Sequence, residues 1–253
     1  MISRKDENAV ATLTLNSNAA NSVDLNVCGE FEKILDQLEK DRSIKVVILT
    51  GNSGFFSNGF EPTGFVNQSD EKVAELLRRA FQISYRLYCL PQITIAAING
   101  HAMGVGAIWA VHMNYRIAVS KVRIGFPEAL IGLAIPSAPA FLLQALVGPQ
   151  KCRDLSFEGT GLKSEAAKEI GLVDEVVAAD DLHNSAAKLA KKFLGTPFDV
   201  IAGNQLSTKA PYSELLQRLV EKDVEMGVSL VKSPNGQEGL SSILEKRRPV
   251  FKD

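Results

Sequence analysis

The sequence contains few residues of the kinds that form metal centres and covalent cross-links. It has three cysteines and three histidines among 253 residues. Cys28, Cys89 and Cys152 lie far apart, which excludes the paired spacing of a zinc site or a disulfide framework. The histidines do not cluster with carboxylates, so we expect no metal site. Unpaired cysteines are typical of a protein from a reducing compartment.

Long apolar runs and an excess of charge are also absent. No run approaches the roughly 20 apolar residues that a membrane-spanning helix needs. The first ten residues, MISRKDENAV, resemble neither a secretory signal nor an Arg/Ser-rich presequence. The net charge of −1 provides no overall positive field for nucleic acid. We therefore expect a cytoplasmic protein with no nucleic-acid or membrane partner, with a processed organellar protein as the alternative.

What the sequence does contain is typical of a globular α/β protein. It is 45% hydrophobic and 23% charged, and a chain of this length buries a sizeable core without cross-links. Short apolar runs predict strands at 9–15, 45–50, 92–98, 116–120 and 175–177. Apolar residues at helical spacing predict helices at 27–38, 73–87, 165–169 and from about Asp181 onward. Strands alternating with helices indicate a layered α/β architecture.

Two glycine-containing bends follow predicted strands and are candidates for binding a ligand. The first is 55–60 (FFSNGF), and the second is 99–106 (NGHAMGVG), which leads into an apolar helical run. Such a bend leaves backbone N–H groups free, and two of them aimed at one carbonyl oxygen form an oxyanion hole. A plain β-turn and tight backbone packing are the alternatives for these two segments.

A lone carboxylate is the third candidate. Glu128 lies in an apolar stretch, 124–133, directly after Pro127. Burial would raise the pKa of its carboxyl toward the range that is useful for general acid–base catalysis. The alternative is a glutamate that only begins a helix.

Five segments together resemble the crotonase family of enoyl-CoA hydratases and isomerases over nearly the whole chain. Each motif is modest by itself, but five in the family's order are specific. The segments are 56–61 (FSNGFE), 97–106 (AINGHAMGVG), 125–136 (GFPEALIGLAIP), 167–176 (AKEIGLVDEV) and 238–251, which begins with EG and ends with ILEKRRPVF.

The resemblance implies a fold and an assembly. Residues 1–195 would form an α/β, crotonase-like spiral of ββα units that carries an acyl-CoA site. Residues 196–253 would form a C-terminal helical region that acts as a trimer interface or lid. We expect a homotrimer or hexamer, since this tail contains the apolar residues Leu215, Leu216, Leu219 and Val220. The implied ligand is a coenzyme A thioester as substrate, with no cofactor.

The resemblance also implies roles for individual residues. The backbone N–H groups of Phe60 and Val105 would form the oxyanion hole that holds the enolate of the thioester. Ser57, Gly59 and Gly104 would lie against the ligand. Valine at 105, where many relatives have glycine, would narrow the pocket without removing the N–H donor.

Lys246 matches a family lysine that reaches the CoA phosphates of a neighbouring subunit. A nearly neutral protein needs local positive charge to bind a polyanion. A solvated basic turn, 246–248 (KRR), is the alternative.

One position favours an isomerase over a hydratase. Hydratases of this family use two glutamates. In this sequence the first of the two positions is occupied by Ile108 and the second by Glu128. Isoleucine cannot position water or transfer a proton. A single base is enough to move a double bond, because it can remove a proton from C2 and return it at C4. The early 20–23 (ANSV) also resembles the start of mitochondrial-type isomerases.

Two departures from the family pattern and three alternatives stay open. Glu61 stands where the family usually has aspartate, and 137–140 reads SAPA where many hydratases are glycine-rich. A 2-enoyl-CoA hydratase would need a second acid, for which Glu61 and Glu158 are candidates. A crotonase-like protein that binds acyl-CoA without catalysis is the third hypothesis. For His101 the two alternatives are contact with the ligand and packing within its own loop.

Overall fold

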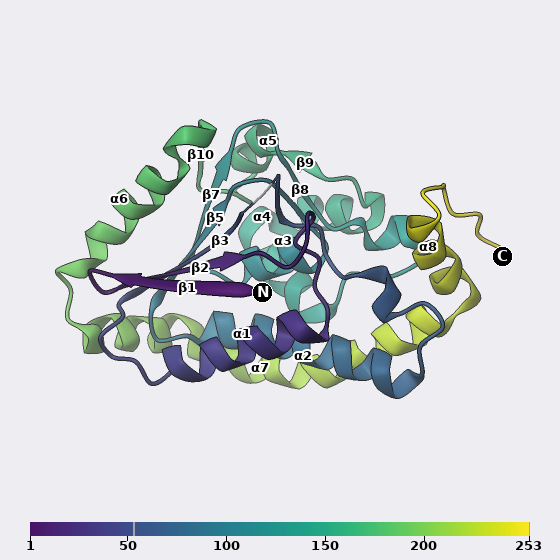
Figure 1. The fold of residues 1–253 in the computed structure, drawn as a ribbon, viewed down its shortest axis with the longest axis horizontal. Helices are drawn as coiled ribbons and strands as arrows, with labels where there is room; N and C mark the ends of the chain where they lie inside the picture. The colour runs from purple at the N-terminus through teal and green to yellow at the C-terminus, as the bar shows by residue number, and fades with distance from the viewer. Residues whose placement is uncertain (53, 253) are drawn as a thin grey trace.

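The chain folds into two β-sheets with helices around them, as a computed structural model shows for residues 1–52 and 54–252 (Figure 1). The strands of the larger sheet, in spatial order, are β1 (Ile2–Glu7), β2 (Val10–Leu15), β3 (Val46–Gly51), β5 (Ile93–Ile98), β7 (Tyr115–Val119) and β10 (Glu175–Val177). Those of the smaller sheet are β4 (Phe55–Ser57), β6 (His101–Met103), β8 (Arg123–Gly125) and β9 (Leu162–Lys163). The five strands predicted from the sequence all belong to the larger sheet.

Three successive segments repeat the same order of two strands and a helix. They are β3-β4-α2, β5-β6-α3 and β7-β8-α4. In each of them the first strand joins the larger sheet and the second joins the smaller one. The helices are α2 (Asp70–Cys89), α3 (Val105–Val111) and α4 (Ser137–Glu158), and short 3-10 helices η1 (Pro62–Gly64) and η2 (Pro127–Ile131) precede α2 and α4. This repeat is the predicted spiral of ββα units.

The larger sheet is covered on both faces. Every residue of β3 is buried, which explains why its sequence is an unbroken apolar run rather than an alternating one. On one face, Leu182, Ala186 and Ala190 of α6 (Leu182–Leu194) pack against β-strand residues that include Ile48 and Ile117. The other face packs against the main core. The helices not yet named are α1 (Leu25–Leu38), α5 (Ser164–Glu169) and the 3-10 helix η3 (Ala179–Asp181).

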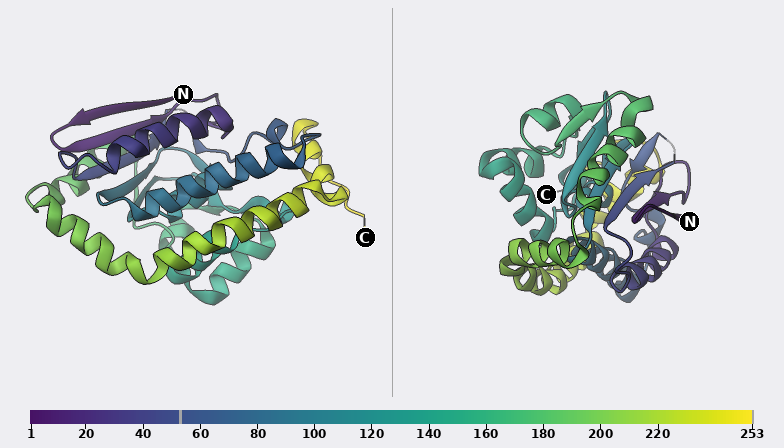
Figure 2. Two further views of the ribbon diagram at one scale, coloured as in Figure 1. Left: turned by 90° about the horizontal axis from the view of Figure 1, so that it is seen from below. Right: turned by 90° about the vertical axis from the view of Figure 1, so that its left-hand side faces the viewer.

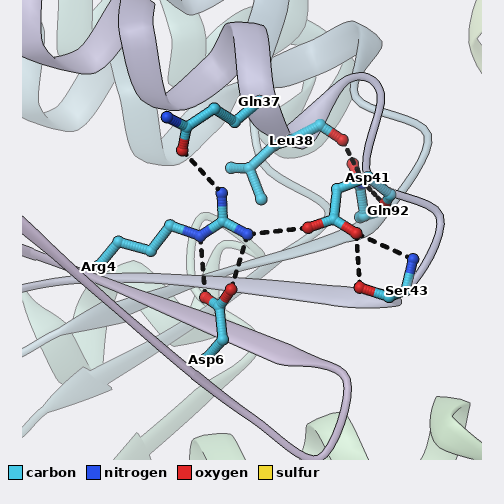
Figure 3. A network of polar contacts seen from close by, with 7 residues as sticks. All are labelled: Arg4, Asp6, Gln37, Leu38, Asp41, Ser43 and Gln92. Carbon is cyan, nitrogen blue, oxygen red and sulfur yellow. Dashed lines mark hydrogen bonds and ion pairs between the residues drawn. The ribbon is translucent and has the colours of Figure 1, made fainter.

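The polar N-terminal strand β1, which the sequence did not predict, is held by ionic contacts. Figure 3 shows Arg4 between two carboxylates: its guanidinium donates to Asp6 and, at 3.0 Å, to Asp41. It also donates to Gln37 near the end of α1. The pKa of Asp41 is lowered, chiefly by the hydroxyl of Ser43 and also by Arg4. These contacts tie the β1–β2 hairpin to α1.

The C-terminal region is helical, as expected, and packs on its own chain. Helix α7 (Phe198–Lys232) runs alongside α2 (Figure 2), and α8 (Pro234–Leu244) follows after Ser233, whose hydroxyl accepts from Gly236 N at 3.0 Å. Leu216 and Val220 are buried in the core of this same chain. These two residues are therefore used within the subunit, and the trimer or hexamer stays a prediction.

Asp223 connects α7 to the beginning of α4. Helix α4 begins after Pro136, which provides no side-chain cap. Both carboxylate oxygens of Asp223 replace that cap, because they accept from Ser137 N at 2.7 Å and Ala138 N at 2.9 Å. The aspartate is 2% exposed. These charge-assisted bonds satisfy two N–H groups that the helix itself leaves unpaired.

We predict that Asp223→Asn lowers the free energy of unfolding by about 1–3 kcal/mol, because an amide NH₂ cannot accept and one buried N–H loses its partner. Urea unfolding measures this change. The matched control is Glu225→Gln, an exposed residue of the same helix, for which a change within about 0.5 kcal/mol is expected. Equal stabilities of the two variants would contradict the proposed contact.

Candidate active site

One cavity contains most of the candidate residues. It has a volume of about 390 Å³, within the range of small-molecule sites, and its wall is mainly apolar. Residues of η1, α2, α3, η2, α7 and α8 contribute to it. Gly59, Phe60, Gly104, Val105 and Glu128 all lie on this wall.

The smaller sheet explains why these five residues meet. β4, β6 and β8 are neighbours and run parallel to one another. The bend with Gly59 and Phe60 follows β4, Gly104 and Val105 follow β6, and Glu128 follows β8. Parallel neighbours end at the same edge of a sheet and lie about 4.8 Å apart. The three candidate segments are therefore brought to one place by strands of three residues each.

Two glycines allow the first two segments to come into contact. Gly59 has a φ of 94° and Gly104 a φ of 53°, values that side chains disfavour. A Cβ added at Gly104 would lie 3.7 Å from the Cα of Gly59 and 3.6 Å from Oε1 of Glu128. The two bends and the carboxylate thus surround one small region of the cavity.

The N–H groups of Phe60 and Val105 have no hydrogen-bond partner among the described residues. In the first bend, Val23 donates to Gly59 O and accepts from Glu61 N, both at 2.9 Å. Successive N–H groups of an extended segment alternate in direction, so the N–H of Phe60 points away from Val23. Val105 is the first residue of α3, where an N–H has no partner within the helix. Both groups can therefore donate to a ligand.

The carboxyl group of Glu128 is desolvated. Its Oε2 is inaccessible to solvent and has no hydrogen-bond partner in the described part of the chain. Burial raises the pKa of Glu128 from 4.5 to about 7. A carboxyl with this pKa exchanges protons readily near neutral pH, as a general base must.

Two predicted site residues lie outside this cavity. Ser57 is fully buried, and its hydroxyl donates to Asn21 O at 2.8 Å and accepts from Gly59 N at 3.3 Å. It therefore shapes the first bend from behind. Lys246 is exposed beyond α8 and does not line the cavity of its own chain. Its proposed contact with CoA phosphates stays a prediction.

The alternative acids and the loop histidine do not reach the cavity wall. Neither Glu61 nor Glu158 lines the cavity. His101 packs in its loop, with its ring 5.5 Å from that of Phe55 and its Nδ1 accepting from Arg123 N at 2.9 Å. This packing agrees with the structural alternative for His101.

Asp223 was missed by the sequence-based reasoning, yet it lines the cavity beside Ile108. Its carboxylate is engaged by the N–H groups of α4. Asn99 was also missed as an individual residue. Its Oδ1 accepts from Gly51 N at 2.8 Å and so joins the second bend to the end of β3. No signal in the sequence places Asp223, on a distant helix, next to the glycine bends.

Residues 1–52 and 54–252 contain neither a cluster of metal-ligating side chains nor a membrane-spanning helix. No group of three or more His, Cys, Asp or Glu side chains there could hold a metal ion. Within the same residues, no helix is long and apolar enough to cross a membrane.

The chain belongs to the enoyl-CoA hydratase/isomerase family, the crotonase family, since the family's sequence profile matches residues 5–253. A probable enoyl-CoA hydratase of Bacillus subtilis (strain 168) is 29% identical over 252 residues, covering 96% of this chain and 95% of the relative. The mitochondrial enoyl-CoA delta isomerase 1 of Mus musculus is 29% identical over 241 residues, covering 94% and 83%. Because the identity to the hydratase and to the isomerase is the same, these two relatives do not distinguish between the two reactions.

Solved structures share the fold. The human mitochondrial delta3-delta2-enoyl-CoA isomerase superposes with a TM-score of 0.92 at 24% identity, covering 97% of both chains. An enoyl-CoA hydratase from Bacillus anthracis superposes with a TM-score of 0.79 at 27% identity, covering 99% of this chain and 98% of the other. The predicted crotonase fold is confirmed.

The desolvation of Glu128 predicts a pH-dependent stability. The folded chain binds the Glu128 proton more tightly than the unfolded chain, so wild-type protein loses stability as the pH rises from about 4.5 to about 7. At 1.36 kcal/mol per pKa unit, the loss is at most about 3 kcal/mol. Glu128→Gln cannot ionise, so its stability relative to wild type should increase over this interval and then level off.

Urea unfolding of both proteins between pH 4.5 and 8 measures the difference. Glu158→Gln, which removes an exposed carboxyl, is the control and should show no such trend. A Glu128→Gln difference that is constant with pH would show that the carboxyl is hydrated.

Proposed function

We propose that this protein is an enoyl-CoA isomerase that converts 3-enoyl-CoA to 2-enoyl-CoA with Glu128 as its single base. The observation that carries the proposal is the carboxylate content of the cavity. Among the described residues, only Glu128 and Asp223 bring carboxylates to its wall, and both oxygens of Asp223 already accept N–H groups. Glu128 is thus the one carboxyl available for proton transfer.

The reaction follows from the three groups around the cavity. The thioester oxygen accepts from the N–H groups of Phe60 and Val105, which makes the C2 proton more acidic. Glu128 removes that proton, and the electrons of the C2–H bond move into the carbonyl to give a dienolate. The same carboxyl then returns the proton at C4. The carbonyl re-forms as the double bond shifts to C2–C3, and Glu128 is again ionised.

A 2-enoyl-CoA hydratase is the alternative reaction, and the cavity gives it less support. Hydration needs a group that positions water opposite the proton donor. Ile108 stands at that position, is 2% exposed and offers no polar atom. Asp223 is the other carboxylate on the wall, but a proton on it would remove the charge that strengthens the two hydrogen bonds at the beginning of α4.

We propose that Lys246 binds the phosphates of CoA. The next residue, Arg247, forms ion pairs with Glu238 and Glu245. Lys246 has no ion-pair partner among the described residues, and it is exposed on the same C-terminal turn. An unpaired ammonium group gives this chain, whose net charge is −1, local positive charge. That charge can bind the phosphates of a CoA molecule that occupies the site of a neighbouring subunit.

We predict that purified protein isomerises 3-enoyl-CoA and that Glu128→Gln reduces its turnover by about 10²-fold or more, with acyl-CoA affinity nearly unchanged. Because the base must be ionised, wild-type kcat/KM should increase with pH up to about 7 and then level off. The measurement is a parallel assay on 3-enoyl-CoA and 2-enoyl-CoA, with affinity from calorimetry. Glu61→Gln and Glu158→Gln are the matched controls and should retain turnover.

Three results would lead to other conclusions. Full isomerase turnover by Glu128→Gln means that another acid acts. Hydration of 2-enoyl-CoA without isomerisation supports the hydratase. Binding of acyl-CoA with no turnover of either substrate supports the non-catalytic hypothesis.

A further prediction concerns Lys246→Ala, which should weaken CoA binding several-fold at low salt and make it less salt-dependent, because an exposed charge is screened as salt rises. Calorimetric titration with free CoA at two salt concentrations measures both effects. Lys40→Ala, an exposed lysine just beyond α1, is the control. Unchanged affinity at low salt would assign Lys246 to a solvated turn.

A further inference from the structure

We infer that Gln237 of α8 is a positioning residue for the proposed reaction, because it fixes the segment that begins at Phe60 relative to the segment that carries Glu128. The inference rests on the proposed function for the identity of the reaction. It adds a residue that belongs neither to the oxyanion hole nor to the base.

The oxyanion donor and the base lie on separate segments that have to keep a fixed separation. β4 and β8 determine where these segments begin. From there 60–67 runs through η1 toward α2, and 126–136 runs through η2 toward α4. A displacement of about 1 Å between reacting groups can lower a rate by about 10²-fold. Contacts that restrain both segments beyond the sheet therefore affect catalysis, and α8 contacts both η1 and η2.

On the η2 side, the backbone of α8 packs directly against the segment of the base. A Cβ added at Gly239 would overlap the carbonyl oxygen of Ile131, and one added at Gly132 would lie 2.7 Å from Asn235 O. Gly132, whose φ is 71°, ends the 3-10 helix that contains Glu128. Backbone contacts this close leave η2 little room to move relative to α8.

On the η1 side, a single side chain makes the contact. The Nε2 group of Gln237 donates to Phe65 O at 3.4 Å and to Val231 O at 2.7 Å. Its Oε1 accepts from Asn67 N at 3.2 Å. The nitrogen meets two carbonyls and the oxygen meets an N–H, so only one orientation of the amide satisfies all three bonds. Gln237 therefore ties the end of η1 to α7 and α8.

The link reaches the oxyanion donor through two aromatic rings. Phe65 is 2% exposed, and its ring meets that of Phe60 edge to face, with the centroids 5.1 Å apart. Such pairs prefer this geometry, so a shift of 65–67 changes the position of Phe60. Hydrogen bonds to the thioester oxygen are strongest when it carries the charge of the enolate. A displaced Phe60 N–H therefore slows the reaction more than it weakens binding of the substrate.

A neighbouring link persists when the Gln237 amide is removed. Lys232, the last residue of α7, donates to Gln68 O at 2.7 Å and forms an ion pair with Asp70 at 3.1 Å. It holds the beginning of α2 beside the end of α7, so variants of Gln237 are expected to fold.

The variant Gln237→Met tests the inference, because methionine keeps the length of the side chain and removes its three hydrogen bonds. We expect kcat for 3-enoyl-CoA to fall about tenfold, a part of the roughly 10²–10³-fold that loss of a whole oxyanion donor costs. Affinity for hexanoyl-CoA, which binds without reacting, should change less than about threefold. The pH profile of kcat/KM should stay as in wild type. Gln217→Met, at an exposed glutamine of α7, is the matched control and should retain all of these values.

Infrared difference spectroscopy of bound hexanoyl-CoA, isotope-labelled at the thioester carbonyl, measures the oxyanion bonds directly. A hydrogen bond polarises the carbonyl and lowers its stretching frequency. Wild-type protein should therefore lower the frequency relative to free ligand, and Gln237→Met should lower it less. A residue that only stabilises the fold would change the melting temperature without changing this frequency.

Gln237→Glu covers the case in which the methionine variant does not fold. Its carboxylate can accept from Asn67 N but cannot donate to Phe65 O, so kcat and the carbonyl frequency should move in the same directions. A wild-type carbonyl frequency in a folded Gln237 variant would overturn the inference. Failure of the proposed function is a separate outcome, because 3-enoyl-CoA would then not be isomerised while the infrared comparison would still show whether Gln237 positions the Phe60 N–H.

Discussion

The candidate site depends on the parallel pairing of three very short strands. β4, β6 and β8 have three residues each, and together they fix the ends from which the oxyanion bends and the Glu128 segment emerge. Isolated strands of this length would not be stable. They persist because each is joined to a long strand of the larger sheet, which is buried between helices. The larger sheet thus provides the stability, and the smaller one positions the site.

The C-terminal helices complete the wall of the cavity that the short strands position. α7 lies along α2, contributes part of the cavity wall and holds the beginning of α4 through Asp223. The segment between β8 and α4 contains Glu128. A single long helix therefore shapes the space for the ligand and restrains the chain just beyond the proposed base. Burial of the Glu128 carboxyl on the same wall raises its pKa.

Much of this arrangement could be predicted from the sequence at positions where the residue type strongly prefers one backbone conformation or a buried environment. The apolar runs of the larger sheet and the amphipathic helix at 73–87 correspond to β3, β5 and α2. The bends that contain Gly59 and Gly104 were predicted to leave backbone N–H groups free, and both glycines have a positive φ. β1 was missed because its polar sequence is stabilised by Arg4 and not by a buried apolar face.

By itself the sequence determined the family through the order of its motifs, and that resemblance implied the ββα repeat and singled out the lone carboxyl, Glu128. Only the tertiary structure decided which residues share the cavity. Ser57 belongs to the recognised motif but turns its hydroxyl into the protein, while Asp223 belongs to no motif and lies on the wall. The physical reason is that burial and proximity come from contacts between distant segments. Glu128 Oε2 loses its hydration only in the folded chain, where residues of η2, α3 and α7 line the same cavity.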